Sequence, residues 1–145
     1  FRALPGELAG AVRGLDDAQL DTPYRPGGWR VRQVVHHLAD SHLNALIRLK
    51  LALTEDAPAI KAYDEKRWAE LADSRLPVAP ALQILEGVHA RLVALLTEMP
   101  PEAFARTLVH PVNGAMPIDI LVALYSWHGR HHVAQITGLR LRQGW

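Results

Sequence analysis

The stretch of sequence most informative about the fold reads WHGRHHVAQI and runs from Trp127 to Ile136. It lies within residues 118–142, where apolar residues recur at intervals of three and four, as on one face of an α-helix. The members of this stripe are Leu121, Leu124, Tyr125, Gln135, Ile136 and Leu139. His128 and His132 fall in its middle. We therefore predict a core-facing helix that carries two histidines on its buried face.

Working outward, three further segments show helical periodicity, at residues 7–19, 31–53 and 78–99. Proline and glycine interrupt the pattern between them, as expected for loops. Residues 100–115 are predicted to form a loop, and a short helix is predicted at 64–71. Because no convincing strand or repeat is found, we expect an all-α four-helix bundle that forms a single domain over residues 1–145.

The composition narrows the classes of function. The chain has 145 residues, no cysteine and a net charge of +1. Without cysteine there is no disulfide, thiolate ligand or cysteine nucleophile, which fits a reducing cytoplasm. The small net charge gives no electrostatic basis for binding nucleic acid. No apolar run approaches the length expected of a membrane span. We expect a small-molecule partner, and neither nucleic acid nor a membrane.

Histidines are the chemically suggestive residues, because six of the eight fall in two clusters. His128 and His132 are four residues apart, so their rings are neighbours on one helical face and can chelate one ion. Two unpartnered imidazoles in an apolar stripe would be costly. We weighed a metal site against two hydrogen-bonded core histidines and favour the metal. His131 points to a flank and is interpreted as a solvated or hydrogen-bonded side chain.

The third ligand is expected from the second cluster, which contains His36, His37 and His42. Helical periodicity places His42 in the apolar stripe and His37 about 120° away, so the pattern alone nominates His42. Three histidines suit zinc, nickel or ferrous iron and leave positions open for water or substrate. Asp40 is a candidate base or orienting carboxylate, with a solvated carboxylate as the alternative.

Two more residues are candidates for the same pocket. Gln135 follows His132 by three residues and is expected to line the site in a catalytic role. The polar and aromatic segment 62–68 contains Asp64. It would cover the metal if it folds over the bundle, although a solvated loop anchored by Trp68 is the slightly favoured interpretation.

Two longer motifs resemble those of a known superfamily. Residues 28–42, GWRVRQVVHHLADSH, resemble the opening motif of the DinB/YfiT-like superfamily, and residues 127–136 resemble its closing motif. The similarity to the YfiT branch extends to residues 19–25, to Tyr63-Asp64-Glu65 and to the terminal Gly144-Trp145. It covers nearly the whole chain.

The resemblance implies a DinB-type four-helix bundle, usually a homodimer, with one divalent metal ion held by three histidines. In the family motif the first ligand stands eight residues after the tryptophan, which is His37 here, and the other two match His128 and His132. This selects His37 over His42 as the third ligand, and His42 is expected to line the cavity with Asp64 as a cofactor-binding residue.

Two classes of function follow. The first is a metal-dependent enzyme that activates either water, as a hydrolase, or a low-molecular-weight thiol. The resemblance implies transferases that use bacillithiol, mycothiol or glutathione, with bacillithiol S-transferases as the nearest branch. Of the metals that suit three histidines, we expect zinc or nickel. The second is a non-catalytic, metal-stabilised dimerisation or binding module. A fourth protein ligand from His42, Asp40 or His131 would favour that second class.

Overall fold

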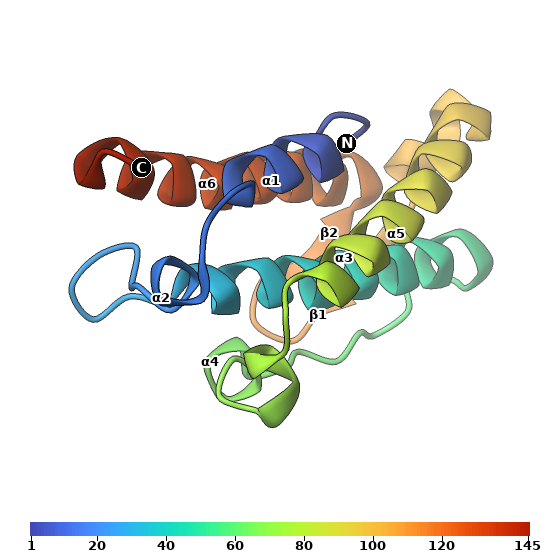
Figure 1. The fold of residues 1–145 in the computed structure, drawn as a ribbon. Helices are drawn as coiled ribbons and strands as arrows, with labels where there is room; N and C mark the ends of the chain where they lie inside the picture. Colours follow the sequence, from blue (N-terminus) through green and yellow to red (C-terminus); the bar gives the residue numbers. More distant parts are fainter.

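A computed structural model describes all residues from 1 to 145, and it is dominated by helices (Figure 1). The helices of the bundle are α1 (Leu4–Val12), α3 (Val31–Thr54), α5 (Ala79–Glu98) and α6 (Ile118–Gln143). The remaining elements are α2 (Asp17–Leu20), α4 (Glu65–Trp68), the 3-10 helices η1 (Ala72–Arg75) and η2 (Pro101–Ala105), and strands β1 (Thr107–His110) and β2 (Gly114–Pro117). The predicted bundle is confirmed, with the addition of a small sheet.

The four helices pack in two pairs. In Figure 1, α1 and α6 lie together along one side and α3 runs along the other, with α5 crossing beside α3. Helix α3 packs against both α5 and α6, and α1 packs against α5 and α6. Helix α3 also contacts α2, η1 and β1, so the peripheral elements rest against it as well as its two long neighbours.

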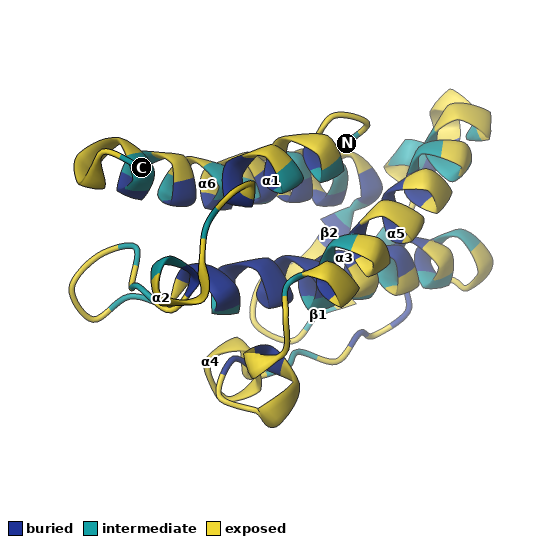
Figure 2. Cartoon of the chain, in the orientation of Figure 1, coloured by how far each residue is buried: buried dark blue, intermediate teal, exposed yellow.

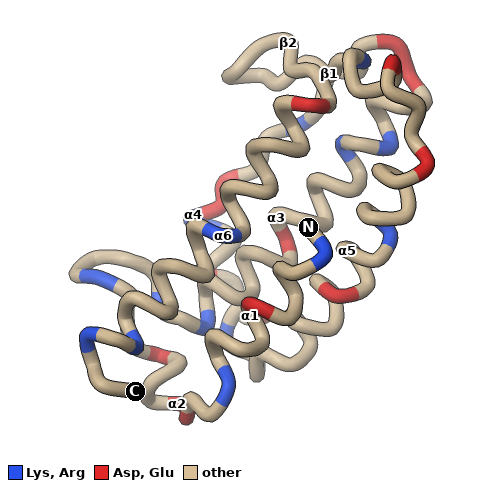
Figure 3. Tube along the Cα trace, turned by 90° about the horizontal axis from the view of Figure 1, so that it is seen from above, with Lys and Arg blue, Asp and Glu red and all other residues tan.

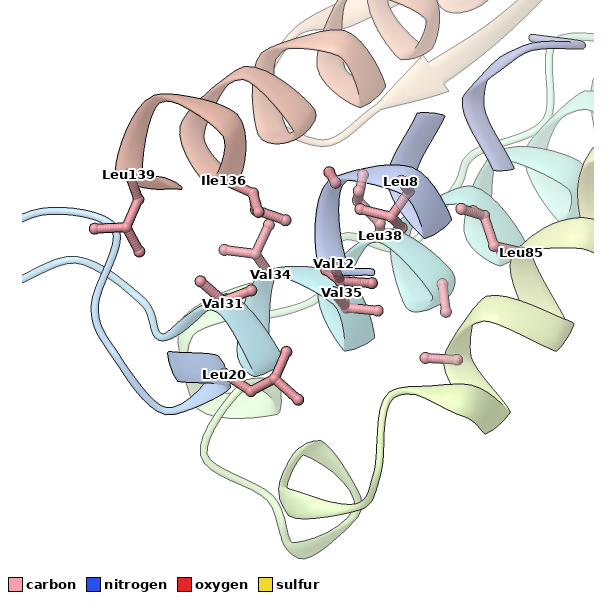
Figure 4. Close-up of a cluster of buried hydrophobic side chains, with 13 residues drawn as sticks. Leu8, Val12, Leu20, Val31, Val34, Val35, Leu38, Leu85, Ile136 and Leu139 are labelled. Carbon is pink, nitrogen blue, oxygen red and sulfur yellow. The ribbon is translucent and has the colours of Figure 1, made fainter. Parts of the chain in front are cut away.

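The apolar core lies between these helices (Figure 4). Leu8 of α1, Leu38 of α3, Leu85 of α5 and Ile136 of α6 are each fully buried. Burying one such side chain contributes about 1.5–3 kcal/mol. The dark inner faces in Figure 2 show that all four helices turn their buried residues toward this core. The core therefore fixes how α3 and α6 lie against each other.

Helix α3 is buried around most of its circumference along its first half. Ten of the twelve residues from Val31 to His42 are buried, and they include His36 and His37 as well as His42. A helix with neighbours on several sides has no single buried stripe, so periodicity alone cannot rank these three histidines.

The predicted first helix, 7–19, is wrong in its bounds. Helix α1 ends at Val12, and the separate helix α2 begins at Asp17. Gly14 adopts a φ of 76° between them, a conformation that glycine tolerates and that breaks the helix. Asp16 then caps α2, because its side chain accepts a hydrogen bond from the backbone N–H of Gln19.

The predicted loop 100–115 is also wrong in part. Strands β1 and β2 form an antiparallel hairpin in which Thr107 pairs with Pro117. The backbone of Val109 also bonds to Pro58 and Ile60, so the hairpin holds the long connection after α3. Four-residue strands give too little alternation to be recognised from sequence.

A buried arginine holds the peripheral segments onto α3. The guanidinium of Arg32 donates to Asp17 at 2.7 Å, to Asp21 at 2.9 Å and to the carbonyl oxygen of Leu76 at 3.2 Å. These bonds tie α2 and the segment after η1 to the first turn of α3. Arg32 thereby holds α2 and the segment after η1 against the first turn of α3, the helix that carries His37.

The remaining charges are spread over the surface without a block of one sign (Figure 3). Helix α5 is long and apolar enough to span a membrane by length and composition, which the sequence reading did not expect. Its buried residues, among them Leu85 and Leu92, pack into the bundle core. The core helix of a soluble bundle can have the same length and composition, so this feature is weak evidence that α5 spans a membrane.

Candidate metal centre

Three histidine side chains converge from two helices. His37 comes from α3, and His128 and His132 come from successive turns of α6. The Nε2 atom of His128 lies 3.2 Å from that of His37 and 3.1 Å from that of His132. Nitrogens bound tetrahedrally to one ion at about 2.0–2.1 Å are separated by about 3.3 Å. The three imidazoles are therefore spaced to hold a single divalent ion.

The predicted residue Gln135 orients one of these rings. Its Oε1 atom lies 2.8 Å from Nδ1 of His132, and its amide nitrogen lies 2.9 Å from Nε2 of His131. An amide oxygen can only accept, so Nδ1 of His132 carries the proton and Nε2 presents its lone pair to the centre. Partners of this kind set the tautomer of ligating histidines.

The environment keeps the three rings uncharged. Burial, followed by repulsion from the neighbouring histidines, lowers the pKa of His37 to about 3 and that of His128 to about 3. Burial also lowers the pKa of His132. Neutral imidazole is the form that binds metal, so at neutral pH the site has no protons to release before binding.

A pocket of about 520 Å³ opens beside the three rings. Its other polar lining residues include Ser41, Arg48, Tyr63 and Tyr125, and Trp29 also lines it. Arg48 donates to the hydroxyl of Tyr125 at 2.8 Å. Burial raises the pKa of Tyr125, and the Arg48 guanidinium opposes that shift. The pocket therefore combines the candidate metal centre with a hydroxyl and a cation.

The sequence reading missed these pocket residues, although signals for them exist. Ser41 and Arg48 follow His37 by one and three helical turns, so all three lie on one face of α3. Tyr125 precedes His128 by three residues on α6, within the stripe already noted. Following the face that contains His37, in place of the apolar stripe, identifies both Ser41 and Arg48.

Other predicted site residues lie elsewhere. Asp40 is outside the pocket lining, and its pKa is raised by burial and by Asp73. Asp64 caps α4 by accepting from the backbone N–H of Arg67. His42 does not join the three converging rings but lies behind His128, with ring centroids 5.7 Å apart. The structure thus groups His37, not His42, with the α6 histidines, and gives no contact that supports the predicted roles of Asp40 and Asp64.

The fold and site together define a helical bundle with a three-histidine centre built between α3 and α6. The profile of the DinB superfamily matches residues 1–136. The chain belongs to the DinB superfamily, as the sequence motifs indicated.

Curated relatives and solved structures agree with this assignment. A Bacillus cereus (strain ATCC 10987 / NRS 248) protein named "Putative metal-dependent hydrolase" is 55% identical over 98% of this chain and 82% of its own length. A Bacillus mycoides (strain KBAB4) protein of the same name is 54% identical over the same shares.

Among solved structures, YfiT from Bacillus subtilis, described as "a probable metal-dependent hydrolase with an unusual four-helix bundle topology", superposes with a TM-score of 0.97. It is 49% identical over 99% of this chain and 83% of that chain. The four-helix bundle protein TT2238 has a TM-score of 0.63 at 21% identity, over 94% of this chain and 91% of its own, and shows the fold alone.

The lowered histidine pKa values predict acid sensitivity of the metal-free protein. In the folded state His37 and His128 have a pKa of about 3, below the ordinary value of about 6.5, so the unfolded chain binds more protons between these values. The free energy of unfolding should therefore fall by about 1 kcal/mol or more between pH 7 and pH 4.5. Urea unfolding at a series of pH values measures this. His128→Gln should flatten the dependence, whereas exposed His131→Gln should change it much less, because burial and not His131 is the largest cause of the lowered pKa values. An unchanged slope in His128→Gln would contradict the prediction.

The contact between Gln135 and His132 predicts a loss of metal affinity when it is removed. Gln135→Met keeps the length of the side chain but removes the acceptor, and zinc should bind roughly 10- to 100-fold more weakly. Competition with a fluorescent chelator measures the affinity. Gln143→Met, at the exposed end of the same helix, serves as the control. Equal affinities in the two variants would show that Gln135 does not orient the ligand.

Proposed function

We propose that this protein is a metal-dependent enzyme whose ion, zinc or nickel, is held by His37, His128 and His132. The observation that carries the proposal is the convergence of three neutral Nε2 atoms at the wall of a pocket. The names given to the Bacillus relatives support the same class of activity. When bound, the ion would polarise an electrophile and lower the pKa of a thiol or a water molecule.

The geometry favours a catalytic centre over a purely structural one. A structural site is closed by a fourth protein ligand, and three side chains were candidates for that position. The imidazole of His42 is bonded to His89, that of His131 is bonded to Gln135, and Asp40 lies outside the pocket. None of them joins the group of three rings, so a position remains for a substrate.

Arg48 and Tyr125 supply the polar chemistry of the pocket. Because Arg48 donates to the oxygen of Tyr125, the hydroxyl hydrogen of Tyr125 is free to donate into the pocket. Tyr125 is placed to hydrogen-bond an electrophile or to protonate a leaving group. Arg48 retains further donors for an anionic group on the substrate.

Between the two nucleophiles, a second pocket supports thiol transfer. A pocket of about 780 Å³ is bordered by the loop 24–29 and by residues 65–67. It shares Trp29, Glu65 and His132 with the pocket beside the histidines. Two pockets that meet at the same imidazole suit a reaction with two substrates. We therefore favour a thiol S-transferase of the bacillithiol type and keep hydrolysis as the second candidate, since hydrolysis needs only one organic substrate.

In that reaction the thiol gives its proton to solvent water and its sulfur attacks the electrophilic carbon. The leaving group departs with the bonding electron pair, and a basic leaving group takes a proton from Tyr125, which recovers one from solvent. We further propose that the protein acts in the cytoplasm as a homodimer, as the family resemblance implies. Exposed apolar side chains on α6, such as Ile120 and Trp127, are available for contact with a second copy.

An activity comparison tests the proposed function. The zinc-loaded and nickel-loaded proteins are assayed with chlorodinitrobenzene plus cysteine, glutathione or bacillithiol, and separately with a p-nitrophenyl ester and no thiol. We expect thiol-dependent conjugation. Tyr125→Phe should lower it by about 100-fold, because the hydroxyl no longer hydrogen-bonds the electrophile. The control Gln143→Met, at the exposed end of α6, should leave it unchanged.

The other outcomes decide between the alternatives. Ester cleavage without thiol would favour the hydrolase. If no substrate turns over and removal of metal unfolds the bundle, the protein is a metal-stabilised module and the enzymatic proposal is wrong.

A further inference from the structure

A second pair of buried histidines lies behind the candidate metal centre. His42 on α3 is fully buried and His89 on α5 is 2% exposed. Nδ1 of His42 lies 2.9 Å from Nε2 of His89, and Nδ1 of His89 lies 2.8 Å from the carbonyl oxygen of Phe1. Neither ring belongs to the three that converge on the centre. The pair therefore needs an explanation of its own.

The carbonyl oxygen of Phe1, at one end of this chain of hydrogen bonds, determines which ring nitrogens carry a proton. A carbonyl oxygen only accepts, so Nδ1 of His89 must carry the proton and its Nε2 must accept. His42 then donates from Nδ1. Burial lowers the pKa of both rings, that of His42 to about 2, so each is neutral and has one proton. Nε2 of His42 is left as an acceptor.

Two buried side-chain nitrogens have no hydrogen-bond partner in the protein, namely Nε2 of His42 and Nδ1 of His128. Their rings are neighbours, with centroids 5.7 Å apart and planes inclined by 34°. A neutral His128 that presents the lone pair of Nε2 to a metal must carry its proton on Nδ1. Nδ1 of His128 is then an unpaired donor, and Nε2 of His42 is an unpaired acceptor. Unpaired buried groups of this kind destabilise the folded protein unless each finds a partner.

We propose that His42 is the positioning residue for His128, accepting from its Nδ1–H directly or through one water molecule, and that His89 and the Phe1 carbonyl hold His42 in the required tautomer. This inference rests on the proposed metal-dependent function. Ligating histidines usually donate their second ring nitrogen to an outer partner. Gln135 fills that place for His132, and His42 fills it for His128.

The orienting chain thus links three helices to one ligand. It runs from His128 on α6 through His42 on α3 to His89 on α5, and it ends at the backbone before α1. Phe1 also packs its ring against His89, with centroids 5.4 Å apart. The residues that precede α1 therefore contribute to metal affinity, although they contact none of the three ligands.

Zinc affinity, measured by chelator competition at pH 7, tests the role of His42. His42→Leu should bind about one zinc per chain with roughly 10- to 100-fold weaker affinity. His42→Gln should recover part of the loss, because its amide oxygen accepts and its nitrogen donates. His89→Leu should weaken binding less than His42→Leu, because the acceptor remains but its tautomer is no longer fixed.

The matched control is His36→Leu. His36 is a buried histidine on the same helix, bonded to the carbonyl oxygen of Leu76 and not to the centre. The His36→Leu variant should be less stable than the wild type but should bind zinc with the wild-type affinity. If folded His42→Leu binds zinc as tightly as the wild type, or if His36→Leu is weakened as much as His42→Leu, the proposal is overturned.

A measurement on the unaltered protein covers the case in which His42→Leu does not fold. Long-range ¹H–¹⁵N NMR spectra of the zinc-loaded wild type should show protons on Nδ1 of His128 and Nδ1 of His42, and none on Nε2 of His42. A proton on Nε2 of His42 overturns the proposal. Affinities that follow the prediction in a protein without turnover would uphold this role and refute only the enzymatic function.

Discussion

The packing of α6 against α3 is the contact on which the candidate centre depends. His37 and the pair His128 and His132 are far apart in sequence, and only the contact between these helices brings their nitrogens to about 3 Å from one another. The apolar residues that hold the contact, such as Val34 and Ile136, are fully buried. Because interiors of this density resist small displacements, the core places the three imidazoles before any ion binds.

Two other buried polar groups of α3 are satisfied by the peripheral segments and not by α6. Arg32 is satisfied by two aspartates and a carbonyl, and His36 by the carbonyl of Leu76. Buried polar groups are tolerated when each has a partner. The inward-facing Nε2 atoms of His37, His128 and His132 differ, because their printed neighbours are only one another, and burial lowers the pKa of each ring. A divalent cation bound between these three nitrogens would accept their lone pairs and so supply the missing partner.

Sequence reasoning reached the bundle and the candidate ligands on α6 because their signals are local. His128 and His132 lie one turn apart, and their position in an apolar stripe could be read directly from the chain. The choice between His37 and His42 was different, since α3 is buried on several sides and its periodicity does not indicate which face meets α6. Only the family motif selected His37. The hairpin at 107–117 and the break at Gly14 depend on tertiary pairing and on backbone conformation, which the pattern does not encode.

X-ray absorption spectroscopy of the zinc-loaded protein tests the central claim most directly. The account predicts about one zinc per chain, bound by three imidazole nitrogens at about 2.0–2.1 Å, with the remaining position occupied by a light atom from solvent. Addition of a low-molecular-weight thiol should replace that atom with sulfur at about 2.3 Å. A folded protein that binds no zinc, or one whose zinc is closed by four imidazoles, would contradict the account.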